Sequence, residues 1–156
     1  MKYKKQHKKG FTLIEVLVVI GIIAILATVV LVAVSPGKQF RQARDTQRVA
    51  NVNTILNAIG QNISDHQGVF FCAGSPVTLP AALTNMTSNT ASGGVDIGEC
   101  LVPEYVPKLP YDPLAGKGYY IDEDDYDLGY KVMADSSGRI TVEADGEQQA
   151  LIAVTR

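Results

Sequence analysis

A single carboxylate, Glu15, stands inside the most apolar stretch of the chain, residues 11–34. A charged side chain in such a stretch is costly to bury without a partner, by at least about 2.5 kcal/mol if the stretch enters a bilayer. An acid in this position is therefore a candidate for a functional role. The chemistry that Glu15 offers is pairing with a cation.

A second group of acids lies near the C-terminal end of the chain. Clustered carboxylates supply the oxygen ligands that calcium prefers. The run does not match an EF-hand loop, because Met133 stands at the twelfth position counted from Asp122. Two interpretations stay open: a solvated acidic turn, which we favour, and a weak calcium site. The candidate ligands of that site are Asp122, Asp124, Asp125 and Asp127.

The sequence offers no constellation for catalysis. We find no Ser or Cys nucleophile motif with a histidine partner, and no glycine-rich phosphate-binding loop. The two histidines are His7, among the N-terminal lysines, and His66, so a Cys/His metal site is not credible. We predict that the chain is not an enzyme and requires no cofactor, apart from the weak calcium candidate.

The elements that must position Glu15 begin with the apolar stretch itself. Residues 11–34 form 24 consecutive positions, and a helix of that length spans about 36 Å, enough to cross a hydrocarbon core of ~30 Å. An ordinary secretory signal would have a shorter apolar core. The residues before Gly10 contain five lysines and no acid, which predicts a cytoplasmic N-terminus and an exported remainder. The lysines are Lys2, Lys4, Lys5, Lys8 and Lys9.

A second helix is expected over residues 35–65. Pro36 lacks an N–H and its ring crowds the preceding turn, so a helix must kink or restart there, with Ser35 as its cap. An apolar stripe with steps of three and four residues follows, formed by Val49, Val52, Leu56, Ile59 and Ile63 and widened by Ile55. Polar residues between them are predicted to face water, namely Gln42, Arg44, Asp45, Arg48, Asn51 and Asn57.

Residues 66–156 are predicted to form a globular head. It begins with a loop over residues 72–100, rich in Ser, Thr, Gly, Asn and Ala, and a proline-rich segment follows at 105–113. Strand-like runs lie at 119–121, 128–134, 139–144 and 150–155, with a hairpin turn at 135–138. We therefore predict an α+β fold, in which a long N-terminal helix packs on an antiparallel sheet at about 119–155.

The chain has two cysteines, Cys72 and Cys100, and both lie on the side predicted to be exported. An even number of cysteines in an oxidising compartment favours one disulfide, which would stabilise the head by roughly 3–4 kcal/mol. Two free thiols are the alternative. Either way the predicted role of the pair is structural.

The sequence Lys9-Gly10-Phe11-Thr12-Leu13-Ile14-Glu15 resembles the cleavage and methylation signature of type IV prepilins and of the pseudopilins of type II secretion systems. A basic leader, a small residue, an aromatic residue, an acid and an apolar run occur in the family's order. The resemblance is strong over residues 1–34 and weak beyond. Type IV pilins commonly have a proline near the twenty-second mature position, whereas Pro36 falls at the twenty-sixth.

The resemblance implies that a membrane-embedded prepilin peptidase removes residues 1–10 by cutting between Gly10 and Phe11, and methylates the new α-amine of Phe11. It implies that this amine pairs with Glu15 of a neighbouring subunit in a helical polymer. The precursor would be a single-pass protein of the cytoplasmic membrane. An assembly platform and its ATPase would then insert it into an extracellular pilus.

The resemblance leaves two functions open, a type IV pilin and a pseudopilin of a type II secretion system. Leu109-Pro110-Tyr111-Asp112-Pro113 resembles a turn of both classes, and Leu114 replaces the tryptophan that often follows it in pseudopilins, which favours a pilin. A single-pass anchored binding domain is a third possibility from another class. It would keep its leader.

The distribution of charge is uneven. Loss of residues 1–10 would remove five of the 14 basic residues and leave nine against 16 acids, a net charge of −7. The strongly acidic head makes direct binding of nucleic acid through it unfavourable. Residues 35–64 carry Lys38, Arg41, Arg44 and Arg48 against Asp45 alone. We hypothesise that this basic band meets the acidic head of another subunit; anionic lipid is the alternative partner.

Overall fold

The computed structural model of the chain describes residues 10–156. It contains two compact units, one ending at Gln39 and one comprising Phe40–Arg156. Two helices, α1 (Leu13–Val34) and α2 (Pro36–Asp65), precede the head. The head contains β1 (Phe71–Cys72), β2 (Ser75–Pro76), β3 (Thr84–Thr87), a 3-10 turn η1 (Thr90–Ser92), α3 (Gly98–Leu101), β4 (Tyr119–Tyr120), β5 (Tyr126–Ala134), β6 (Ile140–Asp145) and β7 (Leu151–Thr155). The predicted α+β fold is confirmed.

Helix α1 is apolar on every side. Its side chains from Leu13 to Val32 are exposed in the single chain, and the same 20 residues are long and apolar enough to cross a membrane. Thr12 is the N-cap, and its extended backbone ends the helix on that side. A helix without a polar face cannot be stable in water alone, so α1 requires lipid or other apolar helices around it.

The two helices are separated by one residue. Ser35 has a left-handed backbone, with φ 41°, which ends the hydrogen-bonding pattern of α1. Pro36 is the first residue of α2, where its missing N–H costs little because that N–H would have no partner inside the helix. The predicted restart of the helix at Pro36 is thus confirmed.

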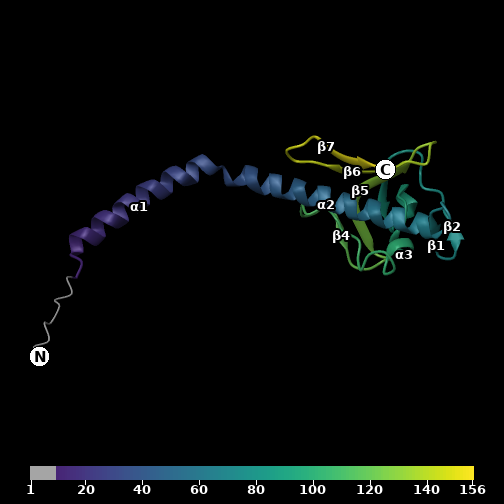
Figure 1. Cartoon of the computed structure of the whole chain (residues 1–156), viewed down its shortest axis with the longest axis horizontal. Helices are drawn as coiled ribbons and strands as arrows, with labels where there is room; N and C mark the ends of the chain where they lie inside the picture. The colour runs from purple at the N-terminus through teal and green to yellow at the C-terminus, as the bar shows by residue number, and fades with distance from the viewer. Residues whose placement is uncertain (1–9) are drawn as a thin grey trace, which may run out of the picture. The chain divides into compact units, whose positions relative to one another are not determined.

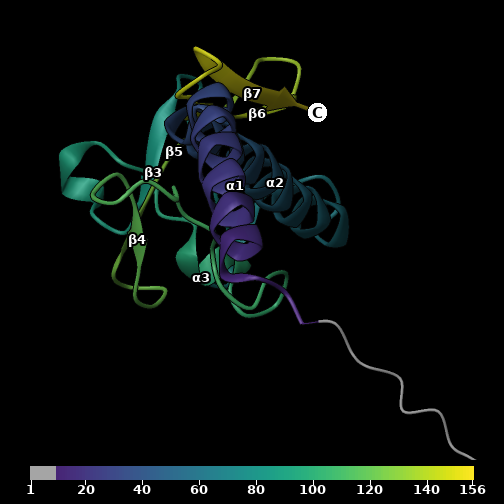
Figure 2. The same ribbon diagram turned by 90° about the vertical axis from the view of Figure 1, so that its left-hand side faces the viewer.

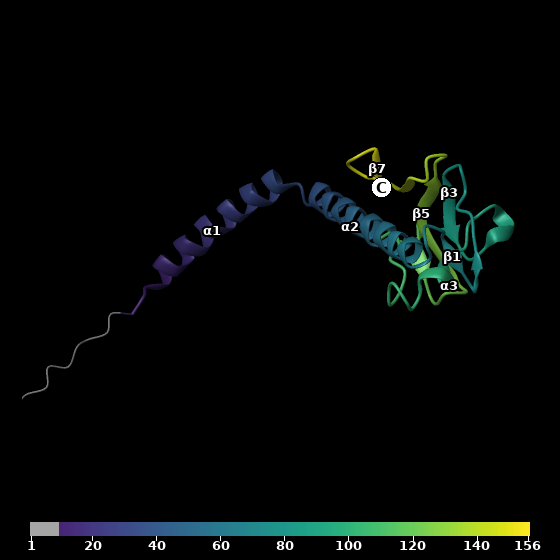
Figure 3. The ribbon, with the colours of Figure 1, turned by 45° about the vertical axis from the view of Figure 1, so that its right-hand side comes forward.

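The main sheet is antiparallel, with the order β3-β5-β6-β7, and β4 also pairs with β5. Figure 2 shows β6 and β7 side by side, and Figure 3 shows β3 beside β5. The predicted turn at 135–138 closes the β5–β6 hairpin, where the N–H of Gly138 donates to the carbonyl of Asp135 over 3.0 Å. Burial alternates along β5 from Tyr126 to Met133 and along β6, so one sheet face is covered.

The covered face packs against α2 (Figure 1). Val52, Ile55 and Ile59 of the helix are fully buried, and they share one core with Leu128, Tyr130, Val132 and Val142 of the sheet. The predicted apolar stripe is correct in its centre, but Val49 is 38% exposed. The buried face of α2 is instead extended toward its N-terminus by Asp45 and Arg48.

The segment predicted as loop 72–100 contains secondary structure. β3 joins the main sheet, and α3 begins at Gly98. The segment has little strand or helix propensity, so local pattern did not reveal these elements. Met86 is fully buried in the core, and Thr87 lies opposite Asp127 of β5, so tertiary packing explains the strand.

Candidate assembly site

The predicted cleavage bond lies outside regular secondary structure, just before α1. Gly10 and Phe11 precede the N-cap Thr12, and the Phe11 side chain is 88% exposed. A peptidase needs an accessible substrate outside regular secondary structure, and both residues of this bond are exposed and precede the helix. Cleavage after Gly10 and methylation of Phe11 remain predictions.

Glu15 closes a capping box at the start of α1. The backbone N–H of Thr12 donates to Glu15 Oε2 over 2.8 Å, and the Thr12 hydroxyl donates to the same oxygen over 2.9 Å. In return the N–H of Glu15 donates to Thr12 Oγ1 over 3.3 Å. The box satisfies two orphan donors of the first turn and holds the carboxylate against Thr12, the residue that follows Phe11.

The capping box uses only one oxygen of the carboxylate. No donor from residues 10–156 reaches Glu15 Oε1. Oε1 can therefore accept a hydrogen bond from a cation on another molecule, while Oε2 keeps its two hydrogen bonds to Thr12. Sequence analysis identified the acid, and the structure adds that residues 10–156 leave one of its two carboxylate oxygens available.

The predicted disulfide is confirmed. Cys72 and Cys100 are bonded across a separation of 28 residues, and the bond ties β1 to α3. Asn62 of α2 holds the backbone on both sides of the disulfide, because its side-chain amide donates to the carbonyls of Phe71 and Cys100 over 2.9 and 3.0 Å. The N–H of Phe71 donates to the Asn62 side-chain oxygen over 2.8 Å. The disulfide and Asn62 thus anchor β1 and α3 to the C-terminal end of α2.

The acidic run follows β4 and faces solvent. Asp122, Asp124 and Asp125 are exposed, and the hydroxyl of Tyr119 donates to Asp125 over 3.0 Å. Asp127 is half-buried in β5 and accepts from the N–H of Gly129 over 2.9 Å. Within residues 10–156, no group of three or more His, Cys, Asp or Glu side chains is placed to share a metal ion.

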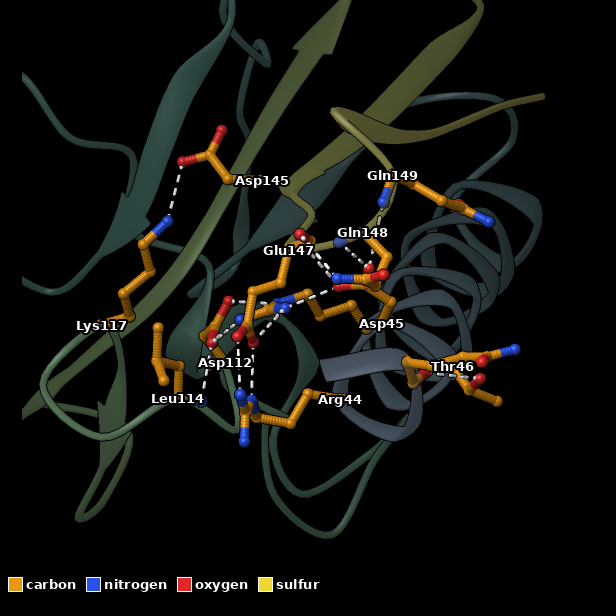
Figure 4. A network of polar contacts seen from close by, with 12 residues as sticks. Arg44, Asp45, Thr46, Asp112, Leu114, Lys117, Asp145, Glu147, Gln148 and Gln149 are labelled. Atoms are coloured by element: carbon orange, nitrogen blue, oxygen red, sulfur yellow. Dashed lines mark hydrogen bonds and ion pairs between the residues drawn. The ribbon is translucent and has the colours of Figure 1, made fainter. Parts of the chain in front are cut away.

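A cluster of buried charges joins α2 to two loops of the head, and sequence analysis did not foresee it (Figure 4). Arg48 is completely buried and forms two parallel bonds of 2.8 Å with Asp112. It also donates to Asp45 over 2.8 Å and to Glu147 over 3.0 Å. Arg44 holds Glu147 with two bonds of 2.6 Å. The prediction that Asp45 and Arg48 face water was wrong, and Arg44 is half-buried.

Asp45 captures the loop between β6 and β7. Its carboxylate accepts the backbone N–H groups of Glu147, Gln148 and Gln149 over 2.8, 2.7 and 3.2 Å. Burial by itself would raise the pKa of Asp45, but these three donors and Arg48 outweigh it and lower the pKa to about 2. The hydrogen bonds from Arg44 lower the pKa of Glu147 to about 2. Burial opposes this shift, and the hydrogen bond from Arg48 adds to it.

One sequence signal could have identified this cluster. Asp45 and Arg48 precede Val52 at steps of three and four residues, so they continue the apolar stripe of α2 on the same face. A charged residue on a buried face requires a partner. The partners themselves come from distant loops and were not predictable from spacing.

This cluster also narrows the hypothesis about the basic band. Arg44 and Arg48 are neutralised inside their own chain, so they are not free to meet another subunit. Lys38 and Arg41 are exposed. If the basic band of residues 35–64 pairs with the acidic head of another subunit, Lys38 and Arg41 must form that contact.

Comparison with known proteins found one family model. It is described as the prokaryotic N-terminal methylation motif and matches residues 5–31. Neither the comparison with curated proteins nor that with solved structures found a match. The family model describes a signal of structural, pilin-type proteins and not an enzyme family. The motif covers the Gly10–Phe11 bond and Glu15, and this chain thus carries the class III signal of a type IV pilin or pseudopilin-like precursor.

Proposed function

We propose that the chain is a structural subunit of a type IV pilus. The observation that carries the proposal is the arrangement at the start of α1, where the exposed Gly10–Phe11 bond lies four residues before Glu15, whose Oε1 is reached by no donor from residues 10–156. Cutting this bond creates a new cation, the α-amine of Phe11. The cation and the acid of the next subunit then form the contact that sets the axial register of the polymer.

Packing of α1 helices supplies most of the affinity in this proposal. The helix exposes large apolar side chains along its whole length, and a polymer buries them against identical helices instead of lipid. Because lipid tails are as apolar as leucine, close packing and polar contacts decide between the two environments. The pairing of Glu15 with the α-amine favours the polymer, since a neighbouring subunit supplies a cationic partner that lipid tails cannot supply.

The processing steps define the partners. A prepilin peptidase cuts after Gly10 and methylates Phe11, and an assembly platform with its ATPase draws the subunit out of the cytoplasmic membrane. The protein is then part of an extracellular filament. Leu114, in place of the tryptophan frequent in pseudopilins, favours this assignment over a subunit of a type II secretion pseudopilus.

Mass spectrometry of sheared surface material tests the processing. The expected N-terminus is methylated Phe11, in abundance, in fibres visible by electron microscopy. Cells that show a secretion defect and form no fibres would identify a pseudopilin instead. An intact leader in the working protein would contradict both assignments and support an anchored binding domain.

Replacement of the acid tests assembly. Glu15→Ala should abolish fibres while the subunit remains cleaved and in the membrane, because the incoming amine loses its acceptor. Thr28→Ala is the matched control, since Thr28 is also a polar residue of α1, with its hydroxyl bonded to the carbonyl of Ala24. The control should polymerise like the parent. Equal yields of Glu15→Ala and parent fibres would contradict the proposed register contact.

A further inference from the structure

A polar cavity of about 400 Å³ opens on the head between β3, the η1 turn and β4. Cavities of this size hold small organic ligands in other proteins. Its walls are formed mainly by amide, hydroxyl and glycine residues, with one aromatic side chain, Tyr119, and one carboxylate, Asp127. The proposed function makes no use of this cavity.

Strand pairing brings the two distinctive groups together. Tyr119 of β4 lies directly opposite Asp127 of β5, and Thr87 of β3 lies opposite Asp127 on the other side. Residues directly opposite in neighbouring strands point to the same face of a sheet. The three side chains therefore form one row across three strands. A Cβ atom added to Gly94 would collide with the side chain of Thr87.

Tyr119 presents a fixed ring to the cavity. Its hydroxyl donates to Asp125 over 3.0 Å, which holds the tip of the side chain, while 48% of the residue stays exposed. The face of an aromatic ring is negative, and it attracts the weakly positive C–H bonds of an apolar ligand face. Such a ring is suited to a flat, aliphatic ligand surface.

The polar groups beside the ring have unused bonding capacity. Asp127 Oδ1 accepts from the N–H of Gly129, but no donor from residues 10–156 reaches Oδ2. The side-chain amides of Asn85 and Asn89 make no hydrogen bond within the same range, and both residues are exposed at the cavity. The cavity thus offers an acceptor and two amides, each able to donate and accept.

The chemistry of the walls restricts the ligand. No Lys, Arg or His of the described chain lines this cavity, which disfavours phosphates and carboxylates. Asp127 is its one acid, and the described residues provide no metal-binding group, which disfavours divalent cations. A neutral ligand that has many hydroxyl groups and one flat C–H face fits all of these features.

We propose that this cavity binds a neutral saccharide, with a pyranose ring stacked on Tyr119 and its hydroxyl groups bonded to Asp127, Asn85 and Asn89. The site lies wholly within the head, so it is independent of α1 and of the choice between pilus and pseudopilus. In a filament the same site would be repeated on every subunit, and many weak sites together give strong attachment.

Saturation-transfer NMR tests the proposal on the full chain in a detergent that has no sugar head group. The probes are the methyl glycosides of glucose, galactose, mannose and N-acetylglucosamine. The parent chain should transfer saturation to at least one of them. Tyr119→Ala should weaken its binding about tenfold, since the stacking surface is lost, whereas Tyr119→Phe keeps the ring and should retain it.

Two further variants separate recognition from damage to the fold. Asp127→Asn keeps the oxygen that accepts from Gly129 but loses the charge of the free acceptor, and it should weaken binding several-fold. Tyr111→Ala removes a tyrosine of similar exposure, 39%, that does not line the cavity, and should bind like the parent. Absence of transfer to all four probes, or unchanged binding by Tyr119→Ala and Asp127→Asn, would overturn the proposal.

Discussion

Arg48 is a fully buried cation that depends on three carboxylates, and each of them depends on it in return. Asp112 has no exposed side-chain surface, and Asp45 has almost none. Burying charges is costly, and the cost is offset only while every member of the cluster is present. The cluster connects α2 to the loop at Asp112 and to the loop that follows β6. It therefore fixes how the head closes around the helix.

Arg48→Met should lower the free energy of unfolding by about 3–5 kcal/mol, because it leaves Asp45 and Asp112 buried without their cation. Urea unfolding of the full chain in detergent, followed by near-ultraviolet circular dichroism of the head tyrosines, measures the loss. Arg41→Met is the matched control, since Arg41 is exposed on the same helix and its loss should cost less than about 0.5 kcal/mol. Equal effects of the two substitutions would mean that the cluster contributes nothing.

The same cluster predicts sensitivity to acid. Folding lowers the pKa of Asp45 from 3.8 to about 2 and that of Glu147 from 4.5 to about 2. A carboxyl whose pKa is lower in the folded state stabilises the fold above its unfolded pKa, and this stabilisation is lost as the pH falls toward the folded pKa. We expect the urea midpoint of the head to be constant above about pH 5 and to fall between about pH 4.5 and 2.

A double variant supplies the control for this prediction. Asp45→Asn combined with Glu147→Gln removes both titrating groups, so its midpoint should be lower at neutral pH and should change less between about pH 4.5 and 2. If parent and variant lose stability in parallel over this interval, other carboxyl groups cause the acid response.

At the level of elements, sequence patterns predicted what depends on neighbours along the chain. The stripe Val52, Leu56 and Ile59 indicated one covered face of α2, and alternation along β5 and β6 indicated one covered face of the sheet. Pro36 indicated the break between the helices. These features arise from periodicity and backbone sterics, which a sequence displays directly.

The elements that sequence analysis missed depend on contacts between distant residues. Arg48 meets Asp112 across 64 positions and Glu147 across 99. β3 exists because β5 offers it a free edge, and its own four residues have no strand pattern. The cavity beside Tyr119 is likewise formed by three strands together. Folding has to bring these residues together before their relation can be recognised.

The disulfide between Cys72 and Cys100 leads to a separate prediction. Replacing both Cys72 and Cys100 with serine should lower the free energy of unfolding by roughly 3–4 kcal/mol, since the open loop gains conformational freedom in the unfolded state. Urea unfolding with and without reductant measures the effect. Reductant should bring the parent to the stability of the double variant and leave the variant unchanged. A variant as stable as the oxidised parent would contradict this expectation.

On the scale of the whole molecule, charge decides how copies approach one another. If the leader is removed as we propose, nine basic residues remain against 16 acidic ones. Much of the basic charge is already paired within the chain, at Arg44, Arg48, Lys117 and Arg139. Heads of equal sign repel each other, and the exposed cations Lys38 and Arg41 are available to offset this repulsion.

Filaments of the double variant Lys38→Gln and Arg41→Gln should therefore dissociate more readily than parent filaments at low salt. The difference should vanish near 1 M salt, where screening acts over about 3 Å. Sedimentation of purified filaments at several salt concentrations measures it. Arg139→Gln, which removes an exposed cation of the head, is the control and should behave like the parent. An undiminished difference at high salt would exclude an electrostatic cause.

The break at Ser35 and Pro36 also limits how deep the C-terminal end of α1 can lie in a bilayer. In a continuous helix the carbonyl of Val32 would accept from the N–H of residue 36, but proline has none. A carbonyl without a donor cannot remain in hydrocarbon, so it must be solvated by water or lipid head groups. If α1 spans the membrane as we propose, its last turn works as a stop that keeps this end of the helix at the outer surface of the bilayer. In that arrangement Glu15 and the Gly10–Phe11 bond, at the other end of α1, would lie at the opposite surface.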